Sequence, residues 1–440
     1  MGLTGLAIFK LLPKTNCKEC GVPTCMAFAM ALASGKATLD QCPYVSDEAK
    51  EALDSATAPP VKLVKAGAGD KVLEMGDEQV MFRHDKTFYH PTGVFIEVAD
   101  NADVAAKVEE INGLVSERVG QTYEVDGIAI VNASGNADTF KDAVATAAGK
   151  TDKVLLLSSE DAAAMEAAAG EVADRKPILN AANADNYEKM VEIAKKISAP
   201  LVVKGKNLDD LADLVGKIDY KELILDSGER ETSKVIADLT QIRRQAIKKR
   251  FRPFGYPSIA FTTEEDPLME GLQAQAYISR YASVVVLKTT ELATLLTLFS
   301  WRSNLYTDPQ KPIAVQPGVY AIGDVTPDSP VYITTNFSLT FYTVQTEVES
   351  TRLPSYLIAF ETEGLSVLTA WAGGKFIGEE VGPWLKDSEI NEKVNHKRLI
   401  IPGGVAAIKG KIEELSGWEV IVGPREANGI SAFAKLKLGA

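Results

Sequence analysis

The chain contains very little histidine: its 440 residues include only His84, His90 and His396. Histidine is the usual general base near neutral pH, and it activates most serine and cysteine nucleophiles. G-x-G-x-x-G and Walker-type phosphate loops are also absent, since Gly67-Ala-Gly69 is not followed by the later glycine. The sequence therefore does not support a nucleophilic triad, a nicotinamide enzyme or a nucleotide enzyme.

A long apolar run is missing as well. Residues 283–301 form the most apolar stretch, but Lys288 and Glu291 interrupt it, and it is too short and polar to span a bilayer. The N-terminal MGLTGLAIFK has no basic flank before its apolar residues, as a signal peptide would have. The formal net charge of −13 argues against nucleic acid as the main partner. We expect a cytoplasmic protein that binds neither a membrane nor nucleic acid.

Cysteine is scarce too, but its four residues are concentrated near the N-terminus as Cys17-x-x-Cys20-x-x-x-x-Cys25 and Cys42-Pro43. A C-x-x-C pair brings two sulfurs from one loop to the same metal centre. The third cysteine at short range and the distant Cys-Pro favour a [4Fe–4S] cluster over zinc, whose sites more often show two paired cysteine knuckles. Nothing indicates export, so disulfides are disfavoured. The pattern predicts one [4Fe–4S] cluster, with structural zinc as the alternative.

The central part of the chain alternates short β-branched runs with helical patterns. Runs that are apolar on both faces and alternate with helices indicate a parallel sheet, and eight of them predict a (β/α)₈ TIM barrel. The eight runs are 94–99, 127–132, 153–159, 177–182, 200–205, 222–227, 257–262 and 283–288. Helical patterns between them include 102–119 and 229–250.

Four domains follow from this pattern. We expect a cluster module at 1–57, a linker leading into the barrel at 58–92, the barrel at 93–310 and a smaller α/β domain at 311–440. Residues 55–69 are rich in proline, glycine and small residues, which is typical of a linker. The last domain should be doubly wound and Rossmann-like, with ligands at the carboxyl ends of its strands. Its expected strands are 331–335, 356–360, 398–401 and 419–422, with helices near 338–349, 364–371, 386–392 and 403–414.

Two sets of residues could carry chemistry. Polar residues end six barrel strands and could form an active-site ring or simple polar caps: Asn132, Ser158, Asn180, Lys204, Asp226 and Thr262. In the last domain, hydroxyls crowd residues 334–346, and small-residue turns lie at 370–374, 402–404 and 423–429. Glycines let the backbone approach a bulky ligand and hydroxyls satisfy its amides, although ordinary caps and turns explain the same residues.

Taken together, the chain resembles the large (gamma) subunit family of the corrinoid iron–sulfur protein of the acetyl-CoA synthase/CO dehydrogenase (Wood–Ljungdahl) pathway. The resemblance covers essentially the whole chain. It rests on the cysteine module, the N-terminal MGLTGLAIFKLLPKTNC, the eight-strand pattern, and the segments TNFSLTFYTVQTEVES and GLSVLTAWAGGKF. The cluster ligands implied are Cys17, Cys20, Cys25 and Cys42.

The resemblance implies that the C-terminal domain binds a cobamide, a vitamin B12-type corrinoid. Its pocket would include Thr340, Thr346, Ala370, Trp371, Ala372, Gly373, Gly374, Gly404 and Phe433. The family's cobalt is base-off, without a histidine ligand. The sequence agrees, because His90-Pro-Thr-Gly93 has Phe88 where a D-x-H-x-x-G loop needs aspartate.

The implied function is that of a methyl carrier, the corrinoid component of an EC 2.1.1-type methyltransferase system in an anaerobic organism. The methyl group comes from methyltetrahydrofolate through a separate methyltransferase and passes to acetyl-CoA synthase/CO dehydrogenase. The cluster returns Co(II) to Co(I), with electrons from a donor such as ferredoxin, and a small subunit completes a heterodimer. Two alternatives remain: a pterin-binding barrel methyltransferase with a structural cluster, and an electron-transfer iron–sulfur protein.

Overall fold

The computed structural model describes residues 5–33, 37, 39–46, 59–118, 121–308 and 311–439. The chain divides into two compact units. One comprises Met1–Val115 and Glu124–Tyr306, and the other comprises Ser116–Tyr123 and Thr307–Ala440. The expected domain limits at residues 57 and 310 fall outside the described residues.

The N-terminal module contains two short helices, α1 (Gly5–Leu11) and α2 (Cys25–Ala33), and the 3₁₀ turn η1 (Leu39–Gln41). The Thr24 hydroxyl accepts the Ala27 amide hydrogen at 3.1 Å and so caps the start of α2. The two helices pack through a small apolar cluster whose buried members are Ile8, Leu12, Phe28, Ala29 and Val45 together with Cys25 and Cys42. Two of the four cysteines are therefore part of the module's core.

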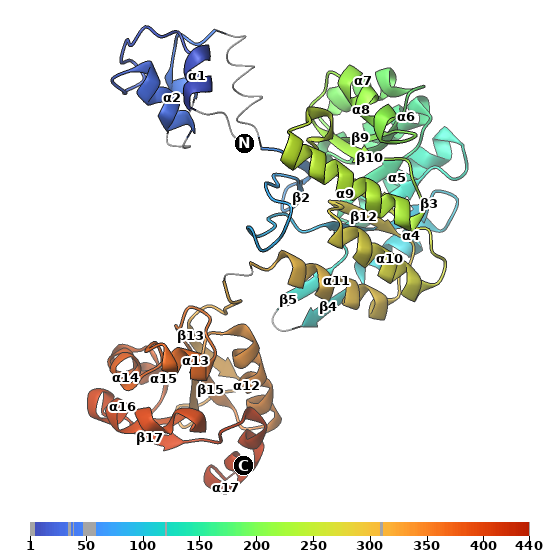
Figure 1. Ribbon diagram of the computed structural model, residues 1–440. Coiled ribbons are helices and arrows are strands. Elements are labelled where there is room, and N and C mark those ends of the chain that lie inside the picture. The colour runs from blue at the N-terminus through green and yellow to red at the C-terminus, as the bar shows by residue number, and fades with distance from the viewer. Residues whose placement is uncertain are drawn as a thin grey trace. The chain divides into compact units, whose positions relative to one another are not determined.

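The eight predicted central strands form one parallel sheet (Figure 1). They are β3 (Gly93–Ala99), β6 (Gly127–Val131), β7 (Val154–Ser158), β8 (Ile178–Ala182), β9 (Leu201–Lys204), β10 (Leu223–Asp226), β11 (Ile259–Phe261) and β12 (Val284–Leu287). Their order is β10-β9-β8-β7-β6-β3-β12-β11. A parallel bridge between Leu225 and Ser258 joins β10 to the chain just before β11, so the sheet closes on itself. This confirms the predicted (β/α)₈ barrel.

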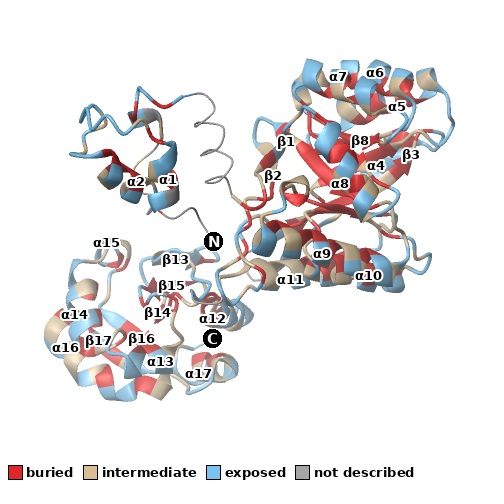
Figure 2. Cartoon of the chain, turned by 45° about the horizontal axis from the view of Figure 1, so that its top comes forward, coloured by how far each residue is buried: buried red, intermediate tan, exposed pale blue. Residues whose placement is uncertain are grey.

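Helices alternate with these strands around the barrel, and apolar side chains fill its interior. The helices are α4 (Val104–Asn112), α5 (Ala137–Lys150), α6 (Ala162–Glu171), α7 (Tyr187–Ile197), α8 (Leu208–Lys217), α9 (Thr232–Lys249), α10 (Pro267–Ser279) and α11 (Leu292–Tyr306). Asn136, Asp161 and Asn207 cap three of them through side-chain oxygens. The interior includes Phe95, Leu156, Ile178, Ile224 and Ile259, and the strands are buried along their length (Figure 2).

Two segments differ from the sequence prediction. The expected linker contains a hairpin of β1 (Val64–Ala68) and β2 (Lys71–Met75), and its Val64 and Met75 join the apolar cluster inside the barrel. Gly67 and Gly69 have φ of +91° and +62°, so the glycines read as linker residues serve this hairpin instead. The helix expected at 102–119 ends at Asn112, and a second hairpin follows, β4 (Val115–Arg118) with β5 (Gln121–Glu124).

The C-terminal unit is built on a five-stranded sheet in the order β13-β15-β14-β16-β17. The four predicted strands appear as β14 (Val331–Thr335), β15 (Ser355–Phe360), β16 (Arg398–Ile401) and β17 (Glu419–Val422), all parallel. β13 (Gly318–Ile322) is antiparallel to β15 and was not predicted, because it lies within a proline-rich stretch. Alternate strand residues enter different apolar clusters: Ile333 and Ile401 lie in one, Tyr332 and Ile400 in the other. The sheet is therefore covered on both faces.

The helices of this unit are α12 (Ser338–Ser350), α13 (Val367–Ala372), α14 (Gly378–Asp387), α15 (Ile390–Lys393), α16 (Lys409–Ser416) and α17 (Ile430–Lys437). The prediction of a helix at 386–392 was displaced, because α14 comes earlier and α15 begins at Ile390. The sequence did not predict α14, because the helix contains Pro383, Gly378 and Gly382, and proline and glycine have low helix propensity. A Cβ at Gly382 would lie 2.7 Å from the Leu415 Cβ, so the glycine permits close packing of α14 on α16.

Candidate functional site

Cys17 and Cys20 lie on the loop before α2, Cys25 is the first residue of α2, and Cys42 follows η1. Cys17 is exposed, Cys20 is half-buried, and Cys25 and Cys42 are buried. Asn16 and Cys25 are joined in both directions: the Cys25 amide donates to Asn16 Oδ1 at 2.8 Å, and the Asn16 amide donates to Cys25 Sγ at 3.4 Å.

The loop that carries Cys17 and Cys20 has an unusual backbone. Lys14, Asn16 and Lys18 take left-handed φ of 59°, 50° and 69°. The Tyr44 hydroxyl donates to Glu19 at 2.9 Å, and this hydrogen bond, with smaller contributions from the charges of Cys17 and Cys42, raises the pKa of Tyr44.

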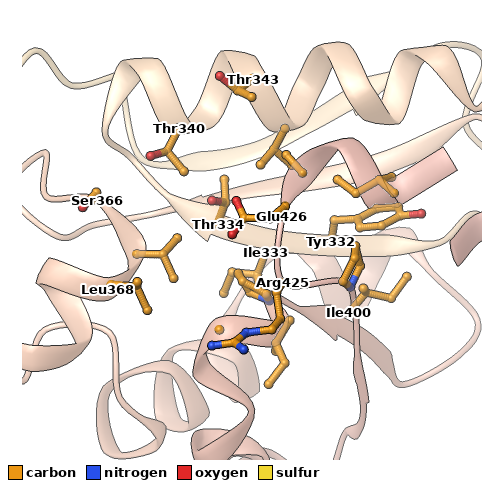
Figure 3. Close-up of a pocket in the computed structure, with 18 of the residues that line it drawn as sticks. Tyr332, Ile333, Thr334, Thr340, Thr343, Ser366, Leu368, Ile400, Arg425 and Glu426 are labelled. Atoms are coloured by element: carbon orange, nitrogen blue, oxygen red, sulfur yellow. The ribbon is translucent and has the colours of Figure 1, made fainter. Parts of the chain in front are cut away.

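The C-terminal unit holds a cavity of about 410 Å³ at the carboxyl ends of its central strands (Figure 3). Its walls come from β14 and β16, the first turns of α12 and α13, and the loop that follows β17. Lining residues are Tyr332, Ile333, Thr334, Leu339, Thr340, Thr343, Val344, Ser366, Val367, Leu368, Ile400, Ile401, Pro402, Gly404, Pro424, Arg425, Glu426, Ala427 and Ile430. The lining is mainly apolar, and its polar members include hydroxyl side chains and the charged residues Arg425 and Glu426.

The sheet topology explains this position. From β14 the chain moves to β15 on one side and then returns to β16 on the other, so the strand order reverses between β14 and β16. Helices on either side of such a switch point diverge and leave a crevice at the carboxyl edge. Two residues that line this crevice, Tyr332 and Thr334, have buried hydroxyls for which the described residues offer no hydrogen-bond partner. Burial raises the pKa of Tyr332 to about 12, so its hydroxyl stays protonated and can donate.

The predicted pocket residues do not all meet at this cavity. Thr340 and Gly404 line it. The Thr346 hydroxyl donates to the Tyr342 carbonyl within α12, and Phe433 packs on the apolar cluster beneath α12. The small-residue turn expected at 370–374 is instead the end of α13 and the two glycines that follow it. Ala370 is fully buried in the domain core, and Trp371 is 42% exposed.

Sequence reasoning missed several lining residues. Tyr332 and Ser366 line the cavity, yet the sequence did not single them out. Arg425 and Glu426 also line it, and they lie in the 423–429 turn that was a candidate region but was not assigned to the pocket. The signal they share is position, because each lies on a central strand or in a segment that follows one. That signal becomes specific only when the strand order is known.

The polar residues at the barrel strand ends mostly pair with their neighbours. Lys204 bonds Glu160 at 2.8 Å, and Arg230 holds Asp226 through both carboxylate oxygens. Asn132 and Asn180 donate to serine hydroxyls, but each has one buried amide oxygen without a partner. No acid–base pair free of such bonds is formed among these six residues, which favours their interpretation as polar caps.

Comparison with known proteins places this chain. A family described as the CO dehydrogenase/acetyl-CoA synthase delta subunit matches residues 63–434. The corrinoid/iron-sulfur protein large subunit of Moorella thermoacetica is 56% identical over 444 residues, covering 100% of both chains. The chain belongs to the corrinoid/iron–sulfur protein large-subunit family.

Archaeal relatives agree with this placement. The acetyl-CoA decarbonylase/synthase complex subunit gamma of Methanopyrus kandleri is 36% identical over 98% of this chain and 97% of its own. The corresponding subunit of Methanothermobacter thermautotrophicus is 35% identical over 98% of both chains. Among solved structures, 7,8-dihydropteroate synthase from Vibrio fischeri ES114 aligns with 53% of this chain and 100% of its own, at 13% identity and a TM-score of 0.38.

The cysteine module has its own family match, to an Fe-S cluster family over residues 12–44. Among the described residues, no group of three or more His, Cys, Asp or Glu side chains is arranged to hold a single metal ion. In a [4Fe–4S] cluster each cysteine binds a different iron, so the sulfurs need not converge on one point. Four thiols, of which Cys20, Cys25 and Cys42 share one apolar cluster, fit that donor set.

Within the part of the chain that the structure describes, no helix has the length and apolar character needed to cross a bilayer.

Proposed function

We propose that this protein is a methyl carrier of the acetyl-CoA pathway, which accepts a methyl group that originates from methyltetrahydrofolate and passes it to acetyl-CoA synthase. The full-length 56% identity to a corrinoid/iron-sulfur protein large subunit supports this role. When bound, the cobalt of a corrinoid would supply the nucleophile that takes up the methyl group. The protein's part is to hold the corrinoid, limit access to it and control its redox state.

The cavity at the switch point is the observation that carries this proposal. An apolar cavity with a few unpaired polar groups is the usual form of a cofactor site. Its 410 Å³ would admit only part of a cobamide, so the rest would lie at the cavity mouth. The hydroxyls of Thr334 and Thr340 would bond polar groups of the cofactor, and Gly404 would leave room for it. Thr346, the 370–374 segment and Phe433 remain predicted contacts outside the cavity.

A base-off cobalt, without a histidine ligand, is part of the proposal. His396 lines a different cavity, together with Arg398 and Lys437. Both of its ring nitrogens are engaged: Nε2 lies 3.0 Å from the Ser329 carbonyl oxygen, and Nδ1 accepts the Arg398 amide hydrogen at 3.2 Å. His84 and His90 belong to the barrel unit, in the segment that precedes β3. Replacing any one of the three should leave the Co(II) electron paramagnetic resonance spectrum unchanged, and loss of a three-line nitrogen pattern in one variant would contradict the proposal.

The cysteine module would supply electrons to the corrinoid. We assign Cys17, Cys20, Cys25 and Cys42 as the ligands of one [4Fe–4S] cluster whose role is to restore Co(I) after accidental oxidation. The partners that follow are a small subunit, the methyltetrahydrofolate methyltransferase, acetyl-CoA synthase/CO dehydrogenase and a low-potential electron donor, in the cytoplasm of an anaerobe.

Absorption spectroscopy and metal analysis of anaerobically purified protein test the proposal. We expect separable corrin and iron–sulfur bands, with about four iron atoms per chain. Cys20→Ala should lose iron but keep the corrin bands, and it should fail to recover from Co(II). One zinc and no iron, or a protein that cannot take up cobalamin, would contradict the assignment.

A second candidate function, pterin binding by the barrel, is favoured by the unpartnered buried amide oxygens of Asn132 and Asn180 at its carboxyl end. Equilibrium dialysis of the isolated chain with methyltetrahydrofolate tests it. Stoichiometric binding that Asn180→Ala abolishes would support a barrel methyltransferase. Absence of binding would leave the methyl-carrier role alone.

A further inference from the structure

We propose that the segment from Lys10 to Lys18 of the N-terminal module, which carries three exposed lysines and the exposed Cys17, docks an acidic one-electron carrier protein. The inference rests on the proposed function, because it takes the four cysteines to be ligands of a redox cluster. It adds the docking surface and the charge of the carrier, neither of which follows from the cluster itself.

The segment that carries the three lysines and Cys17 is exposed. Lys10 is exposed at the end of α1, and residues 14–19 are all exposed. Cys17 is the exposed member of the four cysteines, whereas Cys25 and Cys42 are buried. A carrier that contacts this loop would therefore reach an exposed cysteine directly.

The same segment carries a local positive charge. Residues 10–18 contain three lysines and no acidic residue, although the whole chain has a net charge of −13. The next residue, Glu19, accepts a hydrogen bond from Tyr44 at 2.9 Å, and the Lys14 ammonium lies 5.8 Å from the Phe9 ring centroid. The module thus presents a basic edge on an acidic protein, and the complementary partner is acidic.

A negatively charged cluster would repel an acidic carrier unless nearby positive charges offset the repulsion. Four cysteine thiolates outweigh the charge of an oxidised [4Fe–4S] core, so an acidic carrier would be repelled from a bare cluster edge. Lys14 and Lys18 lie on either side of Cys17 in the sequence, and their charges would offset that repulsion. The effect should weaken as salt rises, because the screening length is about 8 Å at physiological salt. Exposed Leu11 and Tyr44, at 37% and 52%, add apolar contact beside the charges.

Direct binding to a strongly acidic bacterial ferredoxin tests the proposal. The full chain, loaded with iron and corrinoid, is titrated with the ferredoxin by isothermal calorimetry at several salt concentrations. We expect an affinity that falls as salt rises, and a loss of about tenfold or more in Lys14→Glu/Lys18→Glu. The matched control is Lys189→Glu/Lys248→Glu, which makes the same charge change at two exposed lysines of the barrel helices α7 and α9. It should bind within about twofold of the parent.

Three outcomes would overturn the docking surface: equal affinity of Lys14→Glu/Lys18→Glu and the parent, equal losses in the two double variants, or no binding by the parent at low salt. A fourth concerns a different occupant. If Lys14→Glu/Lys18→Glu instead expands the protein in small-angle scattering and leaves ferredoxin binding intact, the lysines hold the module against its own acidic chain. Iron and corrinoid contents of the same samples separate the two proposals. Normal contents without ferredoxin binding defeat only the docking surface, whereas a parent without iron defeats the proposed function.

Discussion

Tyr332 and Ile400 are the single pair of residues that joins β14 to β16, and both line the cavity that opens beside them. By contrast, five pairs join β14 to β15 and four join β16 to β17. The two central strands therefore have little mutual pairing at the point where the strand order reverses. The crevice opens at this same point, where the helices on either side of the sheet diverge.

Gly404→Leu should abolish corrinoid binding. Gly404 lines the cavity, and a Cβ there would already lie 3.3 Å from Leu368 Cδ2, so a larger side chain must enter the cavity. Cobalamin uptake by the anaerobically prepared variant measures the effect. Gly410→Leu is the matched control, because nothing lies within 4 Å of a Cβ at that exposed position of α16. Full cobalamin occupancy in Gly404→Leu would show that the cavity is not the binding site.

Thr334→Val should weaken corrinoid binding while stabilising the empty protein. The Thr334 hydroxyl is buried without a partner, so exchanging it for a methyl group removes a desolvation cost of about 1 kcal/mol. Thr335→Val is the control, since its hydroxyl is equally buried and unpaired but the residue does not line the cavity. Urea unfolding should show both variants stabilised. Cobalamin titration should show a loss in Thr334→Val alone, and equal affinities would remove Thr334 from the site.

Asn16→Ala should make the cluster module more labile. The Asn16 side chain accepts the Cys25 amide hydrogen at 2.8 Å, and asparagine tolerates the left-handed φ of 50° better than alanine does. We expect a destabilisation of about 1–2 kcal/mol and several-fold faster loss of iron to a chelator. Thr15→Ala, at the exposed neighbouring position, is the control. Equal rates of iron loss would mean that this hydrogen bond does not support the cysteine loop.

The Glu124 carboxylate should stabilise the barrel unit in a pH-dependent way. It accepts Lys153 Nζ at 2.7 Å and Lys71 Nζ at 2.6 Å, and these bonds lower the pKa of Glu124 below its ordinary 4.5. A lowered pKa means that the stabilisation is complete above the unfolded value and is lost as the pH falls through the folded value. Glu124→Gln should cost about 1–2 kcal/mol at neutral pH, because Lys153 is buried and loses its ion pair.

The measurement is urea unfolding of the parent and Glu124→Gln between about pH 3 and 7. The difference in unfolding free energy should stay constant down to about pH 5 and shrink below that. Glu192→Gln, an exposed change on α7, should show no such difference. A gap that persists unchanged at pH 3 would rule out the ionised pair as its cause.

Prediction from sequence succeeded where the signal was local and repeated. The eight apolar runs of the barrel are each buried on both faces, so their composition shows directly in the sequence, and all eight strands were found. Prediction failed where composition misled. Gly67 and Gly69 suggested a linker but belong to the β1–β2 hairpin, and Pro383 concealed α14, whose glycines pack against α16.

By itself, the sequence determined the cysteine set, the alternation of strands and helices, and the membership of a family, because each depends on residue type and spacing along the chain. The tertiary structure decided where the C-terminal cavity lies. Tyr332, Ser366 and Arg425 are far apart in sequence and meet only because β14 and β16 become neighbours after the chain reverses its strand order. The spacing of residues along the chain does not show this reversal of strand order, because the reversal depends on which strands pair. The same fold buries the Thr334 hydroxyl without a hydrogen bond among the described residues. The sequence alone does not distinguish this threonine from the others.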